Sequence, residues 1–398
     1  METLGLYVQI PFCASKCSFC NFSSKVSRAE VFSGYCEGVL REIQGLRRHF
    51  DSASVGRGLF ELPADTLYFG GGTPPIIGIE RLEQIIQAVQ EQFRIADSSE
   101  FTLETTPGSA DAAFLERAFA LGVNRLSVGA QSFDDRELDA VGRLHSAADT
   151  RSLVEQARRA GCRNISLDLI AGLPHQTPAS WRASLEAAVQ LQPQHVSVYL
   201  FEVDVKSRLG GEVLRHGTRY HAEAVPDDEF MAEAYENARQ FLLSRGYAQY
   251  EISNFARPGF ESKHNLKYWN LAPYIGLGAG AHSHDGANRW ANEANADIYS
   301  SRLTRDDSPI AELRRLTLEE HLEEFFFLGL RQTQGVCLLQ ASRRWGGHRL
   351  TAFEPVVASL EDRGLLKREG DRIRLAPEAF LFSNEVFQEF LLEKSEAK

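Results

Sequence analysis

Three cysteines lie within eight residues near the start of the chain, in the run Cys13-Ala-Ser-Lys-Cys17-Ser-Phe-Cys20. A CxxxCxxC loop that directly follows a strand can place three thiolates around one face of a cubane [4Fe–4S] cluster. The fourth iron then has no protein ligand, so a small chelating molecule can bind it. Zinc is the competing metal, but a zinc site would want a fourth ligand from a second, paired CxxC, which this sequence lacks. The remaining cysteines are scattered and are expected to be buried small hydrophobes, at Cys36, Cys162 and Cys337.

A glycine-rich turn, Gly70-Gly71-Gly72-Thr73-Pro74, follows the second expected strand. Glycines let the backbone approach a ligand and offer its N–H and C=O groups to the termini of an amino acid. Most glycine-rich turns are only turns. The position of this one, one βα unit after the cysteine loop, favours a ligand site.

Polar residues also stand at the ends of later expected strands. Glu104 ends FTLE, Gln131 ends LSVGAQ, and Arg143 lies in VGRLH. Asp168 interrupts the apolar run ISLDLI. A buried carboxylate needs a partner, which is either a ligand or a structural hydrogen bond or salt bridge.

The elements that must position these residues alternate along the first half of the chain. Short β-branched or aromatic runs alternate with helix-patterned segments, which is typical of βαβ units and a parallel sheet. Six such units are too few for a closed eight-stranded barrel, so we expect an open, partial β/α barrel with its chemistry at the C-terminal strand ends. The expected strands are 4–10, 66–70, 101–105, 125–130, 164–170 and 195–200, and the expected helices lie near 27–49, 79–93, 109–121, 147–161 and 177–190.

The second half of the chain predicts a smaller C-terminal domain. Residues 204–225 are expected to be an irregular charged insertion, followed by a helix at 226–246 and a loop-rich stretch. We expect the barrel to span residues 1–290, a polar linker 291–311, and a C-terminal α+β domain 312–398.

The order of elements in that domain resembles a winged helix. An all-helical stretch at 312–332 is followed by helices at 337–345, 351–363 and 378–394, with a hairpin that turns at Glu369-Gly370-Asp371. Winged helices often bind DNA, but residues 351–398 carry ten acidic and seven basic side chains, which argues against nucleic acid.

Composition narrows the protein class. The 398 residues carry a formal net charge of -11, which is the opposite of the basic field of a nucleic-acid binder. METLGLYVQIPFC lacks the features of a signal peptide, and no apolar run approaches membrane-spanning length. We therefore expect a soluble, cytoplasmic protein.

The run from Tyr7 through the three cysteines, YVQIPFC-x3-C-x-FC, resembles the radical-SAM superfamily and its branch of oxygen-independent coproporphyrinogen III oxidases and relatives. LETTPGS, GVNRLSVGAQSFDD, SLDLIAGLPHQT and SNEVFQEF also resemble segments of this branch. The resemblance implies reductive cleavage of S-adenosylmethionine bound to the unique iron, with an electron donor such as flavodoxin or ferredoxin. It assigns S-adenosylmethionine contacts to Tyr7, Phe19, Gly71, Gly72, Thr73, Glu104, Gln131, Arg143 and Asp168.

His264-Asn265-Leu266-Lys267-Tyr268-Trp269 resembles the HNxxYW motif of the HemW haem chaperones. Neutral imidazole is a common axial ligand of haem iron, and Tyr268 and Trp269 offer apolar faces to a porphyrin. The preceding run SNFARPGFESKHN predicts a loop, so the His264 ring is expected to face outward. A lone histidine is more often structural than a ligand, and the whole motif is what favours haem.

Two positions depart from the oxidase pattern. The oxidase resembles CxxxCxxCxC, but Phe22 stands where the extra cysteine would be, and Gln9 stands where the oxidase and many relatives carry histidine. The sequence therefore favours a haem chaperone that passes haem to a recipient haemoprotein, which a membrane could hold. Two alternatives stay open. One is a radical-SAM enzyme acting on a tetrapyrrole, and the other is a protein whose C-terminal domain docks the recipient.

Overall fold

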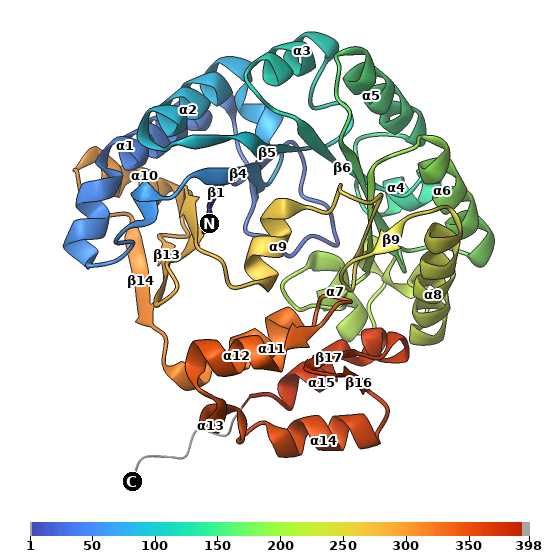
Figure 1. The fold of residues 1–398 in the computed structure, drawn as a ribbon. Helices are drawn as coiled ribbons and strands as arrows, with labels where there is room; N and C mark the ends of the chain where they lie inside the picture. Colours follow the sequence, from blue (N-terminus) through green and yellow to red (C-terminus); the bar gives the residue numbers. More distant parts are fainter. Residues whose placement is uncertain (1, 392–398) are drawn as a thin grey trace.

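The computed structural model describes residues 2–391, and their largest sheet has twelve strands in the order β14-β13-β12-β11-β1-β4-β5-β6-β7-β8-β10-β9 (Figure 1). Seven neighbouring strands are parallel, from β11 to β8. The two end strands do not pair with each other, so the barrel is open, as the sequence predicts. The parallel strands are β11 (Tyr274–Leu277), β1 (Leu4–Ile10), β4 (Ala64–Gly71), β5 (Ile95–Thr105), β6 (Arg125–Gln131), β7 (Ile165–Ala171) and β8 (His195–Leu200).

Apolar residues on both faces explain why these segments form a parallel sheet. Five of the seven residues of β1 are buried, as are six of the seven in β7. Strands buried on both faces occur in parallel sheets that helices cover. An arc of helices surrounds the sheet in Figure 1. These helices are α1 (Ala29–Ala53), α2 (Ile79–Gln92), α3 (Ala112–Ala120), α5 (Ala147–Arg159), α6 (Pro178–Gln190) and α8 (Asp228–Ser244).

The six predicted strands are all present, and β11 adds a seventh parallel strand on the other side of β1. This strand lies inside the stretch expected to be rich in loops. Short antiparallel strands then extend the sheet at both ends. They are β12 (His282–His284), β13 (Asn288–Asn292) and β14 (Ile310–Arg315) at one end, and β10 (Asn254–Ala256) and β9 (Ala248–Gln249) at the other.

Small elements lie in the segments that leave the C-terminal ends of β1, β4, β6 and β8. They are β2 (Phe12–Cys13), β3 (Lys25–Val26), η2 (Pro74–Ile77), α4 (Asp135–Ala140), α7 (Arg208–Leu214) and η3 (Arg219–Ala224). The expectation of an irregular segment at 204–225 is therefore wrong in part. Leu209 of α7 and Ala222 of η3 are buried in a small apolar cluster with Val141 and Ile170, and this burial orders the charged segment.

The segment expected to be a polar linker, 291–311, contains α10 (Ala296–Thr304) between the ends of β13 and β14. Tyr299 of α10 is fully buried, and its hydroxyl donates a hydrogen bond to Glu42 of α1. The segment is mostly polar, so its sequence gives no clear signal of this buried face. The division of the chain into domains at these boundaries stays a prediction.

The C-terminal elements form the predicted winged-helix-like arrangement, with a three-stranded sheet in the order β15-β17-β16. The turn between β16 and β17 lies at Gly370-Asp371, as predicted. The elements are α11 (Leu318–Gly329), β15 (Val336–Cys337), α12 (Leu338–Trp345), α13 (Gly347–Leu350), α14 (Glu354–Asp362), β16 (Leu366–Glu369), β17 (Arg372–Leu375), η4 (Pro377–Phe382) and α15 (Ser383–Gln388). Stacked and tilted rings of Phe326, Phe353 and Phe390 fill the core of this part.

The predicted helix at 312–332 begins too early, because residues 310–315 form β14 and the helix starts at Leu318. Thr317 caps that helix, and Glu320 completes a capping box. Among residues 2–391, no helix is both long and apolar enough to cross a bilayer.

Candidate functional site

Several elements hold the cysteine loop in place. Cys13 ends β2, which pairs with β3 and so closes the loop between them. The Lys16 ammonium donates to the carbonyl of Phe22 at 2.6 Å and to that of Ser24 at 3.0 Å. The Ser18 amide donates to the Val141 carbonyl at 3.0 Å, and its own carbonyl accepts from the Leu209 amide at 2.8 Å. The three thiols therefore sit on a loop whose backbone is already ordered.

Arg143, one of the predicted site residues, lies beside the Cys17 thiol. Its Nη1 is 3.5 Å from the Cys17 Sγ, and its Nη2 donates to the Gly129 carbonyl at 2.5 Å. Its Nε is buried without a hydrogen-bond partner among the described residues. A buried unpaired donor is unfavourable, so Arg143 fits a site where an anionic ligand group supplies the missing acceptor.

Burial raises the pKa of the Cys13 thiol, and Cys17 and Cys20 are near enough to contribute to the rise. Across residues 2–391, no three His, Cys, Asp or Glu side chains are grouped as ligands of a single metal ion. On a cubane cluster each thiolate binds a different iron, so three free thiols on one loop can supply the three protein ligands that such a cluster needs. The donor set fits a [4Fe–4S] cluster.

The glycine-rich turn is tied to the strand that leads into the cysteine loop. The Gly72 amide donates to the Ile10 carbonyl at 2.9 Å, and the Thr73 amide donates to the Phe12 carbonyl at 2.7 Å. A Cβ on Gly72 would lie 2.3 Å from the Phe12 carbonyl oxygen, and Gly71 has a φ of 102°. Close packing of the backbone therefore requires Gly72, and the positive φ favours glycine at position 71.

Glu104 sits directly under this turn. Its carboxylate accepts from the Tyr68 hydroxyl at 2.7 Å and from the Gly71 amide at 3.0 Å. Burial raises the pKa of Glu104 to about 7, and the nearby carboxylate of Asp168 adds to the rise. A cationic ammonium group would favour the ionised form of this carboxyl.

Asp168 has hydroxyl partners inside the sheet. It accepts from Ser197 at 2.7 Å and from Ser127 at 3.5 Å. Burial raises the pKa of Asp168, and these hydroxyls together with the buried Arg125 guanidinium oppose the rise. Asp168 thus has structural hydrogen-bond partners, which is one of the two possibilities that the sequence left open. Gln131, at the end of β6, has a φ of 67°, a strained value of the kind found at binding sites.

Tyr7 joins the candidate S-adenosylmethionine residues to the HNxxYW motif. Its hydroxyl donates to Gln9 at 2.6 Å, and its ring stacks on Tyr68 and on His264, with centroid distances of 5.8 and 6.1 Å. Phe19, from the cysteine loop, packs instead against the small apolar cluster near α7. The structure therefore brings Tyr7, Gly71 and Glu104 together, and separately brings Arg143 to Cys17.

The HNxxYW motif forms the short helix α9 (Lys263–Trp269), which Ser262 caps. His264 is 1% exposed, so the expectation that its ring faces outward is wrong. Its Nδ1 is 2.8 Å from the Thr66 hydroxyl and its Nε2 is 2.8 Å from the Tyr268 hydroxyl. Burial, chiefly, lowers the pKa of His264 to about 3, so the ring is neutral at pH 7.

The other two residues of the motif are half-buried. The backbone N–H of Asn265 donates to the Ser262 hydroxyl at 3.4 Å. The Trp269 ring carries the Arg331 guanidinium 4.5 Å from its centroid, and its Nε1 is buried without a partner in the described chain. Trp269 therefore contacts the segment that follows α11.

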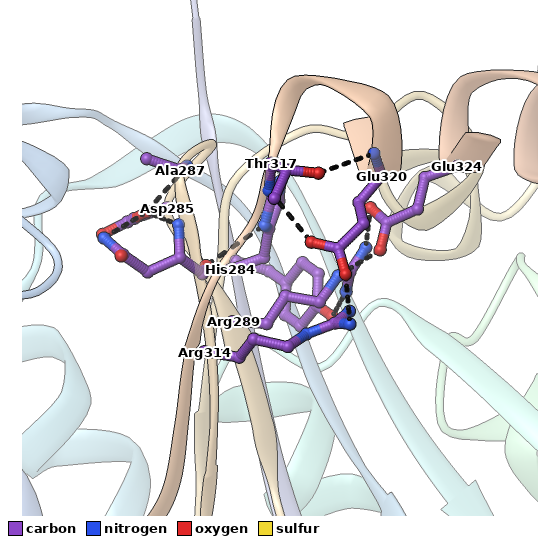
Figure 2. Close-up of polar contacts among 10 residues, drawn as sticks. His284, Asp285, Ala287, Arg289, Arg314, Thr317, Glu320 and Glu324 are labelled. Atoms are coloured by element: carbon purple, nitrogen blue, oxygen red, sulfur yellow. Dashed lines mark hydrogen bonds and ion pairs between the residues drawn. The ribbon is translucent and has the colours of Figure 1, made fainter. Parts of the chain in front are cut away.

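A cavity of about 290 Å³ lies between α9, strands β11 to β13, and α11. Tyr268 is the residue of the HNxxYW motif that lines it, together with Tyr274, His284, Arg289 and Glu324. Figure 2 shows His284, Arg289 and Glu324 with the polar contacts that join β13 and β14 to α11. None of Tyr274, His284, Arg289 and Glu324 is among the site residues expected from the sequence. The dense glycines and aromatics around GLGAGAHSH were the signal available.

Two protein families match parts of the chain. Residues 7–188 match the radical SAM superfamily, and residues 316–382 match the HemN C-terminal domain.

Relatives with names match the chain over nearly its whole length. "Heme chaperone HemW" of Bacillus subtilis (strain 168) is 34% identical over 388 residues, which is 97% of this chain and 99% of the relative. The protein of the same name from Lactococcus lactis is 30% identical, covering 97% of each chain. "Radical S-adenosyl methionine domain-containing protein 1, mitochondrial" of Bos taurus is 32% identical, covering 100% of this chain and 89% of the relative.

A solved structure has the same fold. It is the coproporphyrinogen III oxidase (HemN) from Escherichia coli, described as a radical SAM enzyme. The TM-score is 0.84 at 22% identity, covering 98% of this chain and 90% of the oxidase. The match supports the open barrel and the C-terminal elements as one shared architecture.

Proposed function

Because the chain belongs to the HemW family of the radical-SAM superfamily, we propose that it is a haem chaperone, which binds haem and passes it to a recipient haemoprotein. The observation that carries the proposal is the 34% identity to a named haem chaperone over 97% of this chain and 99% of that relative. A match of this extent includes the barrel, α9 and the C-terminal elements together.

Membership of the superfamily implies a [4Fe–4S] cluster and S-adenosylmethionine, which together supply reductive chemistry when bound. In the proposal, Cys13, Cys17 and Cys20 hold the cluster. Arg143 binds the carboxylate of methionine through its unpaired Nε, and Glu104 accepts from the methionine ammonium group. The cluster and S-adenosylmethionine would control assembly or haem transfer, and an electron donor such as flavodoxin or ferredoxin would reduce the cluster.

Haem binding is assigned to the region of α9. Tyr268 lines the cavity beside this helix, and its ring lies edge-on to Tyr274 at a centroid distance of 4.7 Å. Aromatic walls suit a flat porphyrin, and a neutral imidazole suits its iron. For His264 to bind iron, one of its two ring hydrogen bonds, to Thr66 or to Tyr268, must break.

A haemin titration of the anaerobically reconstituted protein, followed by Soret absorbance, tests the proposal. We expect a saturable shift at one haem per chain and loss of that shift when an apo-haemoprotein is added as acceptor. Absence of a specific shift would contradict haem binding. A shift that no acceptor removes would contradict transfer.

The alternative is a radical-SAM enzyme that modifies a tetrapyrrole, favoured by the fold shared with coproporphyrinogen III oxidase. Formation of 5′-deoxyadenosine in proportion to a modified porphyrin would support it. Phe22 is 69% exposed where the oxidase pattern carries a further cysteine, which argues against the oxidase reaction.

The proposed recipient is a haemoprotein, and a membrane could hold it. The C-terminal elements, which match the HemN C-terminal domain, are the candidate surface that docks it. Charge-reversed variants of exposed residues in α14 should then slow transfer but leave haem affinity unchanged. Unchanged transfer would contradict docking through that helix.

A further inference from the structure

His284 presents an unused ring nitrogen at the wall of the cavity beside α9. The residue is 1% exposed and lies at the end of β12. Its Nδ1 is 3.3 Å from the carbonyl oxygen of Asn288, and its Nε2 is buried with no hydrogen-bond partner in residues 2–391. A buried polar atom without a partner is unfavourable unless a ligand supplies one.

The Asn288 contact fixes the tautomer. A carbonyl oxygen only accepts, so Nδ1 must carry the proton and donate, which leaves the lone pair on Nε2. Burial and the Arg289 guanidinium lower the pKa of His284 to about 4, so the ring is neutral at pH 7. A histidine that ligates a metal through one nitrogen usually donates its other N–H to a carbonyl or carboxylate in this way.

His264, in contrast, has no nitrogen to offer in this structure. Both of its ring nitrogens lie 2.8 Å from a hydroxyl, one from Thr66 and the other from Tyr268. Its backbone amide also donates to Glu100 at 3.2 Å, which fixes the start of α9. The contacts describe a structural histidine that positions Tyr268.

The walls around His284 suit a flat apolar ring. Tyr274 lies 6.1 Å from His284 between ring centroids, and Phe327 and Leu328 of α11 close the other side of the cavity. A cavity of about 290 Å³ is at the lower end for small-molecule ligands, so a porphyrin needs α11 to shift or part of its ring to stay outside.

We propose that Nε2 of His284, and not His264, is the protein ligand of haem iron. The inference rests on the proposed function and names the atom at which the haem cargo is held. The HNxxYW motif then acts through Tyr268, which joins His264 to the wall of the same cavity.

The experiment compares haemin binding by the anaerobically reconstituted wild type and by the variants His284→Ala, His264→Ala and His282→Ala. His282 lies on the same strand but is exposed, so it is the matched control. Soret spectra give the affinity, and electron paramagnetic resonance of ferric haem reports the axial ligand. We expect His284→Ala to weaken binding about tenfold or more and to lose the histidine signature, which added imidazole restores. The other two variants should keep that signature.

Retention of the histidine signature in His284→Ala, or its loss in His264→Ala, would overturn the proposal. His284→Met serves where the alanine variant does not fold. It keeps a ligand, so it should bind haem with a methionine signature, and a histidine signature there would also overturn the proposal. Iron content at the cysteine loop reports that each variant is folded. If the wild type itself binds no haem, the proposed function fails, which is a different result from a wild type that binds through another residue.

Discussion

The guanidinium of Arg289 and the carboxylate of Glu324 form two parallel hydrogen bonds, from Nε to Oε1 and from Nη2 to Oε2, each of 2.8 Å (Figure 2). Arg289 lies on β13 and Glu324 on α11, so the pair joins the main sheet to the C-terminal elements. The remaining Nη1 donates to the Tyr274 hydroxyl at 2.9 Å. All three residues line the cavity, so this pair is the polar contact that joins α11 to the strands on the opposite wall of the cavity.

We predict that Glu324→Ala destabilises the docking of α11. The Glu324 and Arg289 side chains are 9% and 26% exposed, so the variant leaves a mostly buried guanidinium with one neutral partner. The expected loss is about 2 kcal/mol, between the values for exposed and for fully buried pairs. Hydrogen exchange of α11 and the thermal midpoint measure it. The double variant Arg289→Met/Glu324→Leu should recover most of the loss, because it leaves no buried charge. A single variant as stable as the wild type would contradict the prediction.

The raised pKa of Glu104 predicts that the free energy of unfolding of the ligand-free protein decreases as the pH rises. Burial raises it to about 7, whereas an unfolded glutamate has a pKa of about 4.3. Because the pKa of Glu104 is higher in the folded state, the folded protein holds this proton more tightly than the unfolded chain does. The stability that this proton contributes is therefore complete below pH ~4.3, the pKa of the unfolded chain, and is lost as the pH rises to about 7. Relative to Glu104→Gln, the wild type should therefore lose about 3 kcal/mol between pH ~4 and ~7 and change little above that.

Urea unfolding of both proteins across this pH range measures the difference. Glu42 also has a pKa raised to about 7, but it is present in both proteins and cancels. S-adenosylmethionine affinity gives the second readout, because its ammonium group favours ionised Glu104. Affinity should rise as pH increases through 7 in the wild type and should be flat in Glu104→Gln. Parallel affinity curves for the two proteins would contradict the assignment.

The hydrogen bond between Tyr299 and Glu42 fixes α10 to α1, and its loss should lower stability. The Glu42 carboxylate accepts from the Tyr299 hydroxyl, from the Gly278 amide at 2.8 Å and from Asn292 Nδ2 at 2.6 Å. Tyr299→Phe removes a hydrogen bond to a charged group, and the expected loss is about 1.5–3 kcal/mol. Since that bond lowers the pKa of Glu42, the loss should be greater at pH ~8 than at pH ~5. Thermal unfolding at the two pH values measures it, with the exposed Tyr220→Phe as control. An equal loss of stability at the two pH values would contradict the link between this hydrogen bond and the ionisation of Glu42.

The sequence allowed the six βα units to be predicted because each expected strand is a short run rich in β-branched or aromatic residues between helix-patterned segments. β11 was missed since Tyr274–Leu277 is short and lies among glycines, and its pairing with β1 spans most of the chain. β14 was assigned to a helix because its charged side chains continue the pattern of α11. The capping box of Thr317 and Glu320 was a local signal that could have corrected this.

The cysteine loop could be predicted because its chemistry depends on spacing along the chain. The orientation of His264 could not, since its partners come from distant strands, namely Thr66 on β4 and Glu100 on β5. His284 likewise became visible only through its contact with Asn288 and the cavity against α11. For His264 the distant hydroxyl of Thr66 occupies one ring nitrogen, whereas for His284 the local Asn288 carbonyl occupies Nδ1 and leaves Nε2 free.

Gly72 predicts a strict limit on side-chain size at the glycine-rich turn. A Cβ there would lie 2.3 Å from the Phe12 carbonyl oxygen and 2.8 Å from the Ile10 carbonyl oxygen, and backbone atoms cannot move as the end of a side chain can. Gly72→Ala must therefore displace the strand that leads to Cys13. We expect it to lower both stability and the amount of cluster reconstituted on the cysteine loop.

Gly34→Ala is the matched control, because no atom lies within 4 Å of the added Cβ in helix α1, where alanine should stabilise by up to about 1 kcal/mol. Iron content and the thermal midpoint of both variants provide the measurement, and normal iron content in Gly72→Ala would contradict the coupling between the turn and the cysteine loop.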